Sequence, residues 1–316
     1  MTSYGETFQP NHDATMIELN RSILSSEYLA HMRQIVEKQA DSALMTSIAH
    51  NGMRFAILAY AADGNPRILL KTVEQAQKIN RSEINEVIRS YYRVNIWKDH
   101  SDLAEKYPGH RALIDWGRRF IEDEVLPKIH DRNQRYRERE ATCFFWVHRD
   151  APQAVKEALR LLAYIGIVNQ HSSGIKSSKS EVGTRYSVNL GCLFAQDSDP
   201  ASDNSLSSTL PNYMQVDRMT EFGASHSAYK PLLIELKNFV EVDNTDILQK
   251  QLTRPIEALD MSDFFRGKLH EMGLNTVGDV LRTPEEALQQ AYLIGPTRSR
   301  KMHNIASAAV YEYLSG

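Results

Sequence analysis

The motif Gly64-Asn65-Pro66-Arg67 places an arginine in the first turn of an expected helix. Asn65 is a suitable N-cap, and Pro66 at the first helical position loses only a donor that would have no partner there. Because the start of a helix already carries about half a positive charge, Arg67 is unfavourable there by roughly 0.3–1 kcal/mol. A bound anion such as a phosphate would remove this conflict. The alternative is a solvated arginine beside a helix start.

A second candidate site is the glycine hairpin Ile294-Gly295-Pro296, which leads into the last expected helix. Such a hairpin exposes backbone N–H groups at a positive helix end, where a nucleic-acid phosphate fits without any base being read. Counterion release by neighbouring cations would drive this binding. The candidate contacts are Gly295, Thr297, Arg298, Arg300 and Lys301. A protein contact, or a purely structural hairpin that lets two helices pack closely, is also compatible with this pattern.

The third candidate site begins where the sequence changes character, at residue 142. The apolar run Thr142–Val147 indicates a strand, and Asp150 with Gln153 indicates a capping box for a helix that ends at Gly166. A polar loop over 172–180 and a strand over 184–190 are expected to follow. Helix, strand, long basic loop and strand is the order of a winged-helix domain.

In a winged-helix domain the outer face of this helix and the loop would meet DNA. The residues concerned are Gln153, Lys156 and Arg160 on the helix, and Lys176, Lys179 and Arg185 on the loop and the strand after it. They could contact phosphates, with Gln153 or Arg160 reaching base edges. An ordinary exposed face with a mobile loop, or a protein contact, is the alternative.

Composition limits the remaining possibilities. A length of 316 residues suggests two or three domains, and 42% apolar with 24% charged residues is ordinary for a globular protein. The mean hydropathy is −0.45 and no apolar run reaches the length of a membrane span. Two cysteines do not make a disulfide framework, so we expect a cytoplasmic location and no membrane contact. The net charge of −3 means that nucleic-acid binding must come from local patches.

Catalytic and metal-binding motifs are absent from the sequence. GxxxxGK[ST], GxSxG and GxGxxG do not occur, nor do CxxC and HxxxH, and the 11 histidines show no ligand spacing. We therefore expect no catalysis, no metal site and no cofactor for this chain alone.

The expected fold class is mainly α with a small β component. We expect an N-terminal tail with a short strand (1–20), a helical lid-like domain with a linker helix (21–140), a winged-helix-like domain (141–196), a linker or surface loop (197–210), a helical or mixed connector (211–260) and a helix-hairpin-helix domain (261–316).

The order of the Gly64–Arg67 motif, the winged-helix-like segment and the terminal hairpin resembles the C-terminal part of bacterial AAA+ ATPases of the origin-recognition and initiator group. The resemblance covers roughly residues 15–195. A GNPR-like motif in that family is sensor 2, so the resemblance implies that Arg67, next to Asn65, contacts the terminal phosphate of bound ATP. It also implies that residues 142–195 are the DNA-binding winged helix. The hairpin looks more like the helix-hairpin-helix of DNA repair proteins and of the polymerase alpha-subunit tail.

Walker A, Walker B and sensor 1 should precede such a lid, and the sequence lacks them. Either the chain is a truncated product of a longer gene or it has lost nucleotide binding. ATP with Mg²⁺ is expected as a cofactor only if a missing N-terminal ATPase core is present. The expected function is that of a DNA-binding, regulatory C-terminal portion of an initiator-like AAA+ ATPase, not an enzyme by itself. The alternative is an interaction module of a signalling or defence-type ATPase, which binds partner proteins or self-associates through the lid.

Overall fold

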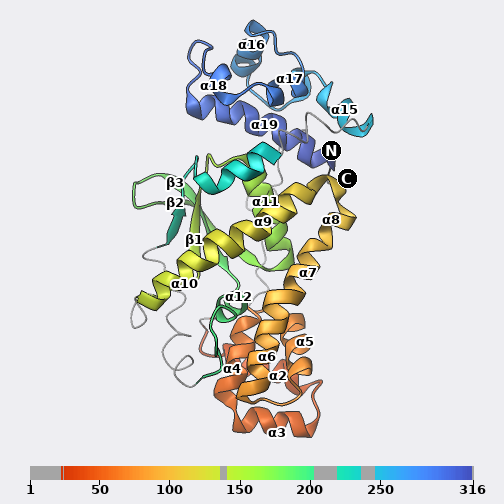
Figure 1. Cartoon of the computed structure of the whole chain (residues 1–316), viewed down its shortest axis with the longest axis vertical. Helices are drawn as coiled ribbons and strands as arrows, with labels where there is room; N and C mark the ends of the chain where they lie inside the picture. The colour runs from red at the N-terminus through yellow and green to blue at the C-terminus, as the bar shows by residue number, and fades with distance from the viewer. Residues whose placement is uncertain (1–22, 24, 136–140, 203–218, 236–245, 315–316) are drawn as a thin grey trace.

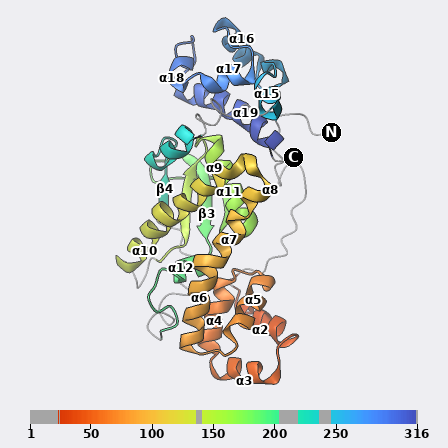
Figure 2. The same cartoon turned by 45° about the vertical axis from the view of Figure 1, so that its right-hand side comes forward.

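The computed structural model describes residues 23, 25–135, 141–202, 219–235 and 246–314. The protein is mainly helical with a small four-stranded sheet, which confirms the expected fold class. Three parts follow one another along the long axis: a helical part, a middle part with the sheet, and a second helical part (Figures 1 and 2). The expected strand within residues 1–20, and residues 203–218 and 236–245 of the two expected connecting segments, lie outside the described residues.

The first helical part contains the Gly64–Arg67 motif at the start of one helix. Its helices are α2 (Tyr28–Glu37), α3 (Ser42–His50), α4 (Gly52–Ala61), α5 (Pro66–Ala76) and α6 (Arg81–Ser90). After a π-helical turn at Tyr91–Asn95 the chain continues into α7 (Ile96–Ser101) and α8 (Leu103–Lys106), which run beside α9 (Arg111–Arg119) and α11 (Gln153–Ile165) of the middle part. The Asn65 side chain accepts hydrogen bonds from the backbone N–H groups of Arg67 at 3.0 Å and Ile68 at 3.3 Å. The expected N-cap is therefore confirmed.

Helices α9 (Arg111–Arg119) and α10 (Leu126–Arg135) are joined by a π-helical turn at Phe120–Val125 and cross the sheet. Phe120 stacks on Trp116 with ring centroids 4.8 Å apart, and its ring lies 4.8 Å from that of Phe222 in the sheet. Both helices fall within the expected lid-like domain (21–140), whereas Phe120 in the turn between them packs on the sheet.

The sheet has the strand order β2-β3-β1-β4. Its strands are β1 (Phe144–His148), β2 (Val168–Lys176), β3 (Val182–Val188) and β4 (Thr220–Phe222), with α11 (Gln153–Ile165) between β1 and β2 and α12 (Leu190–Phe194) after β3. β3 is antiparallel to both neighbours, and β4 is parallel to β1. The expected strand at 142–147 is confirmed, and Gly166 ends α11 in the left-handed region at φ 85°.

Two local expectations in this region are wrong. The segment 172–180 is not a long loop, because β2 continues to Lys176 and pairs with β3 through two bulges, which leaves a turn at 177–181. Pairing with a neighbouring strand overrides the low strand propensity of serine and glycine. Asp150 and Gln153 do not form a capping box, because α11 begins directly after Pro152, whose side chain cannot accept a hydrogen bond.

Residues 195–201 pack along α6 and the π-helical turn that follows it. Arg81 and Asn85 bind the Asp199 carboxylate, and Arg89 and Arg93 donate to the backbone carbonyls of residues 198 and 195. The four side chains recur at every fourth position, so they lie on one face of the continuous helix. The hydrogen bond from Arg81 lowers the pKa of Asp199.

The C-terminal part has its own apolar core, which includes Ile256, Leu269, Val280, Leu288 and Met302. Its helices are α15 (Asp246–Leu252), α16 (Asp263–Glu271), α17 (Val277–Arg282), α18 (Glu285–Leu288) and α19 (Pro296–Leu314). Thr276 caps α17 in a capping box with Asp279. The sequence Thr283-Pro284-Glu285-Glu286 predicts a capping box for α18, but this prediction is wrong, because Pro284 occupies the cap position and makes no side-chain hydrogen bond.

No helix in the described ranges combines the length and the apolar character needed to cross a bilayer.

Candidate nucleic-acid interface

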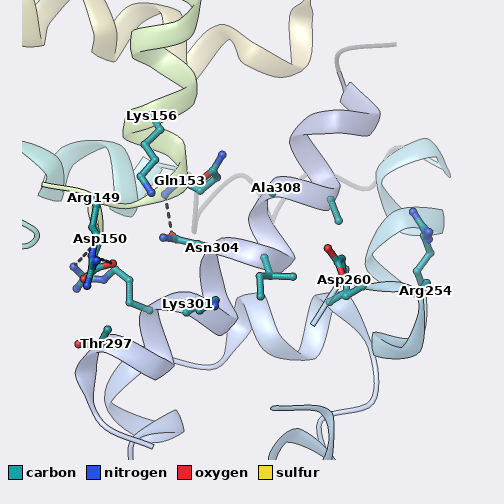
Figure 3. Close-up of a pocket in the computed structure, with 15 residues that line it drawn as sticks. Arg149, Asp150, Gln153, Lys156, Arg254, Asp260, Thr297, Lys301, Asn304 and Ala308 are labelled. Carbon is teal, nitrogen blue, oxygen red and sulfur yellow. Dashed lines mark hydrogen bonds and ion pairs between the residues drawn. The ribbon is translucent and has the colours of Figure 1, made fainter. Parts of the chain in front are cut away.

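A cleft of about 560 Å³ lies between the start of α11 and the first half of α19 (Figure 3). Leu259, Ile305, Ala308 and Ala309 give it an apolar wall. Its charged lining consists of the cations Arg149, Lys156, Arg254, Arg300 and Lys301 and the carboxylates Asp150 and Asp260. We call this site the α11–α19 cleft. Cations outnumber carboxylates in its lining, so the cleft favours an anion.

The cleft exists because α19 docks on the start of α11. The Asn304 side-chain oxygen accepts a hydrogen bond from the Gln153 backbone N–H at 2.9 Å, and the Asn304 amide donates to the Ala151 carbonyl at 3.3 Å. Asn304 thus supplies the N-cap that Pro152 cannot provide. Further along α19, the Tyr311 ring lies 6.2 Å from the buried His110 ring.

Arg300 forms one wall of the cleft and is held by several acceptors. Its guanidinium pairs with both carboxylate oxygens of Glu285, at 2.9 Å for the Nη2 contact, and donates to the Ala224 carbonyl at 2.7 Å. The same side chain therefore links α18 and α19 to the middle part. Its charge is largely compensated by Glu285, so we assign Arg300 a structural role.

Lys156 and Lys301 are the cleft cations best placed to meet a ligand. Lys156 is half-buried, and this burial lowers the pKa of its ammonium group. Neither lysine forms a hydrogen bond or ion pair with a residue that the structure describes, and the Lys301 ammonium lies 6.0 Å from the Phe265 ring centroid. A half-buried ammonium without an acceptor is unfavourable, and an anion in the cleft would satisfy it.

The structure gathers five of the predicted contacts in this one cleft: Gln153, Lys156, Thr297, Arg300 and Lys301. Arg160 lies outside the cleft lining and pairs with Glu157, whose oxygens are 2.9 and 3.0 Å from its Nε. Because α19 covers the start of α11, this helix cannot enter a DNA groove in the described arrangement. The outer face of α11 instead becomes part of the cleft.

The predicted wing residues lie apart from the cleft lining. Lys176 and Lys179 are exposed at the turn between β2 and β3, which is tied to β4 by hydrogen bonds from Ser178 to Glu221 at 2.6 and 2.8 Å. Arg185 is half-buried, with its guanidinium 5.3 Å from the Phe144 ring centroid. The two lysines therefore remain available to a ligand, whereas Arg185 packs on the sheet.

The hairpin before α19 is closed by Arg298, whose Nη1 donates to the Leu293 carbonyl at 2.6 Å. The left-handed residue of this hairpin is Leu293, at φ 66°, rather than Gly295. Gly295 is exposed, and its backbone N–H and that of Thr297 donate no backbone hydrogen bond within the described ranges. The first N–H groups of a helix have no partner within the helix, so this is the ordinary condition of a helix start.

Arg67 lies far from the cleft, at the exposed start of α5. Its guanidinium has no hydrogen-bond or ion-pair partner among the residues that the structure describes. It is close enough to Tyr91 to lower the pKa of that phenol, although burial raises it more strongly. Next to the motif, burial raises the pKa of the Asp63 carboxyl to about 6, and Asn169 of β2 donates a hydrogen bond to it.

Sequence reasoning missed four polar residues of the cleft: Arg149, Arg254, Asp260 and Asn304. Pro152 gave a usable signal, because a helix that starts after proline without a capping side chain needs a cap from elsewhere. Nothing local indicates that Asn304 provides it. Comparison with models of known protein families, with curated proteins and with solved structures found no match.

Proposed function

We propose that this chain is the DNA-binding, regulatory C-terminal portion of an initiator-like AAA+ ATPase. In this proposal α2–α8 form the helical lid, β1, α11, β2 and β3 form a winged-helix-like domain, and α15–α19 form a helix-hairpin-helix domain. The order of these elements and the hairpin before α19 support the assignment. The sequence contains no Walker A or Walker B motif, so any nucleotide hydrolysis is attributed to a separate ATPase core.

The observation that carries the proposal is the cation-lined cleft between α11 and α19. Lys156 and Lys301 lack acceptors among the described residues, and a phosphate backbone would supply them. Lys176 and Lys179 at the β2–β3 turn add two exposed cations. Because α19 lies on α11, contacts would go mainly to phosphates rather than to base edges. Binding would then depend steeply on salt and only weakly on sequence.

Arg67 has a separate role in this proposal. An exposed guanidinium at a positive helix end is suited to the terminal phosphate of ATP held by the ATPase core. Asn65 is committed to capping α5, so its contribution is to fix the helix start on which Arg67 lies.

A titration of fluorescein-labelled duplex DNA with the full chain, followed by anisotropy at several salt concentrations, tests the proposal. We expect the logarithm of the association constant to fall linearly with the logarithm of salt concentration, by about 0.9 for each phosphate contacted. A flat salt response, or no binding at about 0.05 M salt, would contradict the proposal.

Binding of a partner protein is a second candidate function. It is favoured by the exposure of Phe264, Tyr292 and Leu293 beside the hairpin, at 41%, 77% and 56%. This candidate predicts a stable complex in a pull-down experiment and no retention of DNA at physiological salt.

A further inference from the structure

The hairpin before α19 carries an exposed apolar cluster. Tyr292 and Leu293 lie at its tip and are exposed. Arg298 places Phe264 of α16 beside them: its guanidinium is 5.5 Å from the Phe264 ring centroid, and its Nη1 donates to the Leu293 carbonyl. Lys268 of α16 is 5.9 Å from the Tyr292 ring centroid. We call Phe264, Tyr292 and Leu293 the apolar tip. None of the three is explained by burial in the core of the C-terminal part.

Arg298 ties the two sides of the apolar tip together. Arg298 connects the hairpin to α16 through its hydrogen bond to Leu293 and its contact with Phe264. Leu293 has a φ of 66°, a conformation that leucine rarely adopts, and this turns its side chain to the surface. A hairpin whose backbone is already bound in place loses little conformational entropy on binding.

The charges around the tip favour a polyanion over an apolar protein surface. Residues 290–311 contain Arg298, Arg300 and Lys301 and no aspartate or glutamate. Arg300 is compensated by Glu285, and on α16 Arg266 is paired with Asp263 at 2.8 Å and Lys268 with Glu271 at 2.6 Å. The cation left at the tip is Arg298, which lies over the Phe264 ring. Aromatic rings next to uncompensated cations are the combination that binds bases and phosphates of single strands.

On the basis of the proposed DNA-binding function, we further propose that the apolar tip contacts unpaired bases of single-stranded DNA, while Arg298 contacts an adjacent phosphate. The faces of paired bases are covered by their neighbours in a duplex, so the Tyr292 ring can stack only on an unpaired or terminal base. The tip thereby gives this chain a preference for single-stranded DNA over duplex DNA of equal length.

The test compares the full chain with Tyr292→Ala in anisotropy titrations at about 0.1 M salt, using an oligothymidylate of about 20 nucleotides and a duplex of equal length. Loss of one base–aromatic stack is expected to weaken binding to the single strand roughly 5- to 150-fold, with duplex binding unchanged within about twofold. Tyr164→Ala is the matched control, because Tyr164 on α11 is 68% exposed and lies outside the apolar tip. Leu293→Gly, which suits the positive φ, removes the second side chain without straining the hairpin.

Weaker binding to the single strand for Tyr292→Ala and Leu293→Gly, but not for Tyr164→Ala, supports the inference. Unchanged binding to the single strand by Tyr292→Ala, or an equal loss for the duplex, overturns it while leaving the DNA-binding proposal intact. If the unmodified chain binds neither DNA, both proposals fail.

Discussion

The side-chain oxygen of Asn304 accepts a hydrogen bond at 2.9 Å from the backbone N–H of Gln153, which lies 151 residues earlier in the chain. One helix thereby caps another, and the cap fixes the C-terminal part on the sheet-containing part. The α11–α19 cleft, and with it the proposed DNA site, depends on this contact.

Replacing Asn304 with alanine removes the cap of α11. We expect a loss of about 1 kcal/mol in the free energy of unfolding, measured by urea denaturation, because one N–H of the helix start loses its acceptor. Asn304→Asp keeps an acceptor and places a negative charge at a positive helix end, so it should retain most of the stability. Equal stability of Asn304→Ala and the unmodified protein would show that water replaces the cap without cost.

Arg300 is expected to matter for stability more than for DNA contact. Arg300→Ala leaves the half-buried Glu285 and the Ala224 carbonyl without their partner, at a cost of about 2 kcal/mol. Arg298→Ala is the control, because Arg298 is exposed and its loss should cost less than about 1 kcal/mol. Urea denaturation of both variants checks this order, and the reverse order would refute the structural role.

Local patterns in the sequence predicted the fold better than they predicted the site. The Asn65 cap, the strand at 142–147 and the left-handed Gly166 follow from neighbouring residues, and the structure confirms all three. The extent of β2 could not be predicted, because its serines and glycine become strand only through pairing with β3. The cleft joins residues about 150 positions apart, such as Gln153 and Asn304, and no local spacing encodes that contact.

Asp63 gives the helical part a pH dependence. Burial raises the pKa of its carboxyl from 3.8 to about 6, so the folded state binds more protons than the unfolded state between about pH 4 and pH 6. The contribution of this group to stability therefore falls as the pH rises through that window. Asp63→Asn removes the titration and keeps an acceptor for Asn169. We measure the urea midpoint of the variant minus that of the unmodified protein, and we expect this difference to be more positive at pH 7.5 than at pH 4.5. A difference that does not change with pH would contradict the assignment.

Residues 195–201 should become accessible when their contacts with α6 are removed. Asn85 donates to the Asp199 carboxylate at 2.6 Å and accepts from the Ala201 N–H at 2.8 Å. Asn85→Ala loses both bonds, so we expect proteinase K to cleave this segment roughly five- to thirtyfold faster under native conditions. The neighbouring exposed Glu86→Ala is the control. Equal cleavage rates for the two variants would show that the arginines alone hold the segment.

The central claim is that Lys156 and Lys301 bind DNA phosphates in the α11–α19 cleft. The most direct test is the salt dependence of duplex binding for the double variant Lys156→Gln and Lys301→Gln. The control is the double variant Lys38→Gln and Lys78→Gln, whose lysines are exposed on the first helical part. We predict that the cleft variant lowers the slope of the logarithm of affinity against the logarithm of salt concentration by about 1.8, while the control leaves it unchanged. An unchanged slope in the cleft variant would contradict the account.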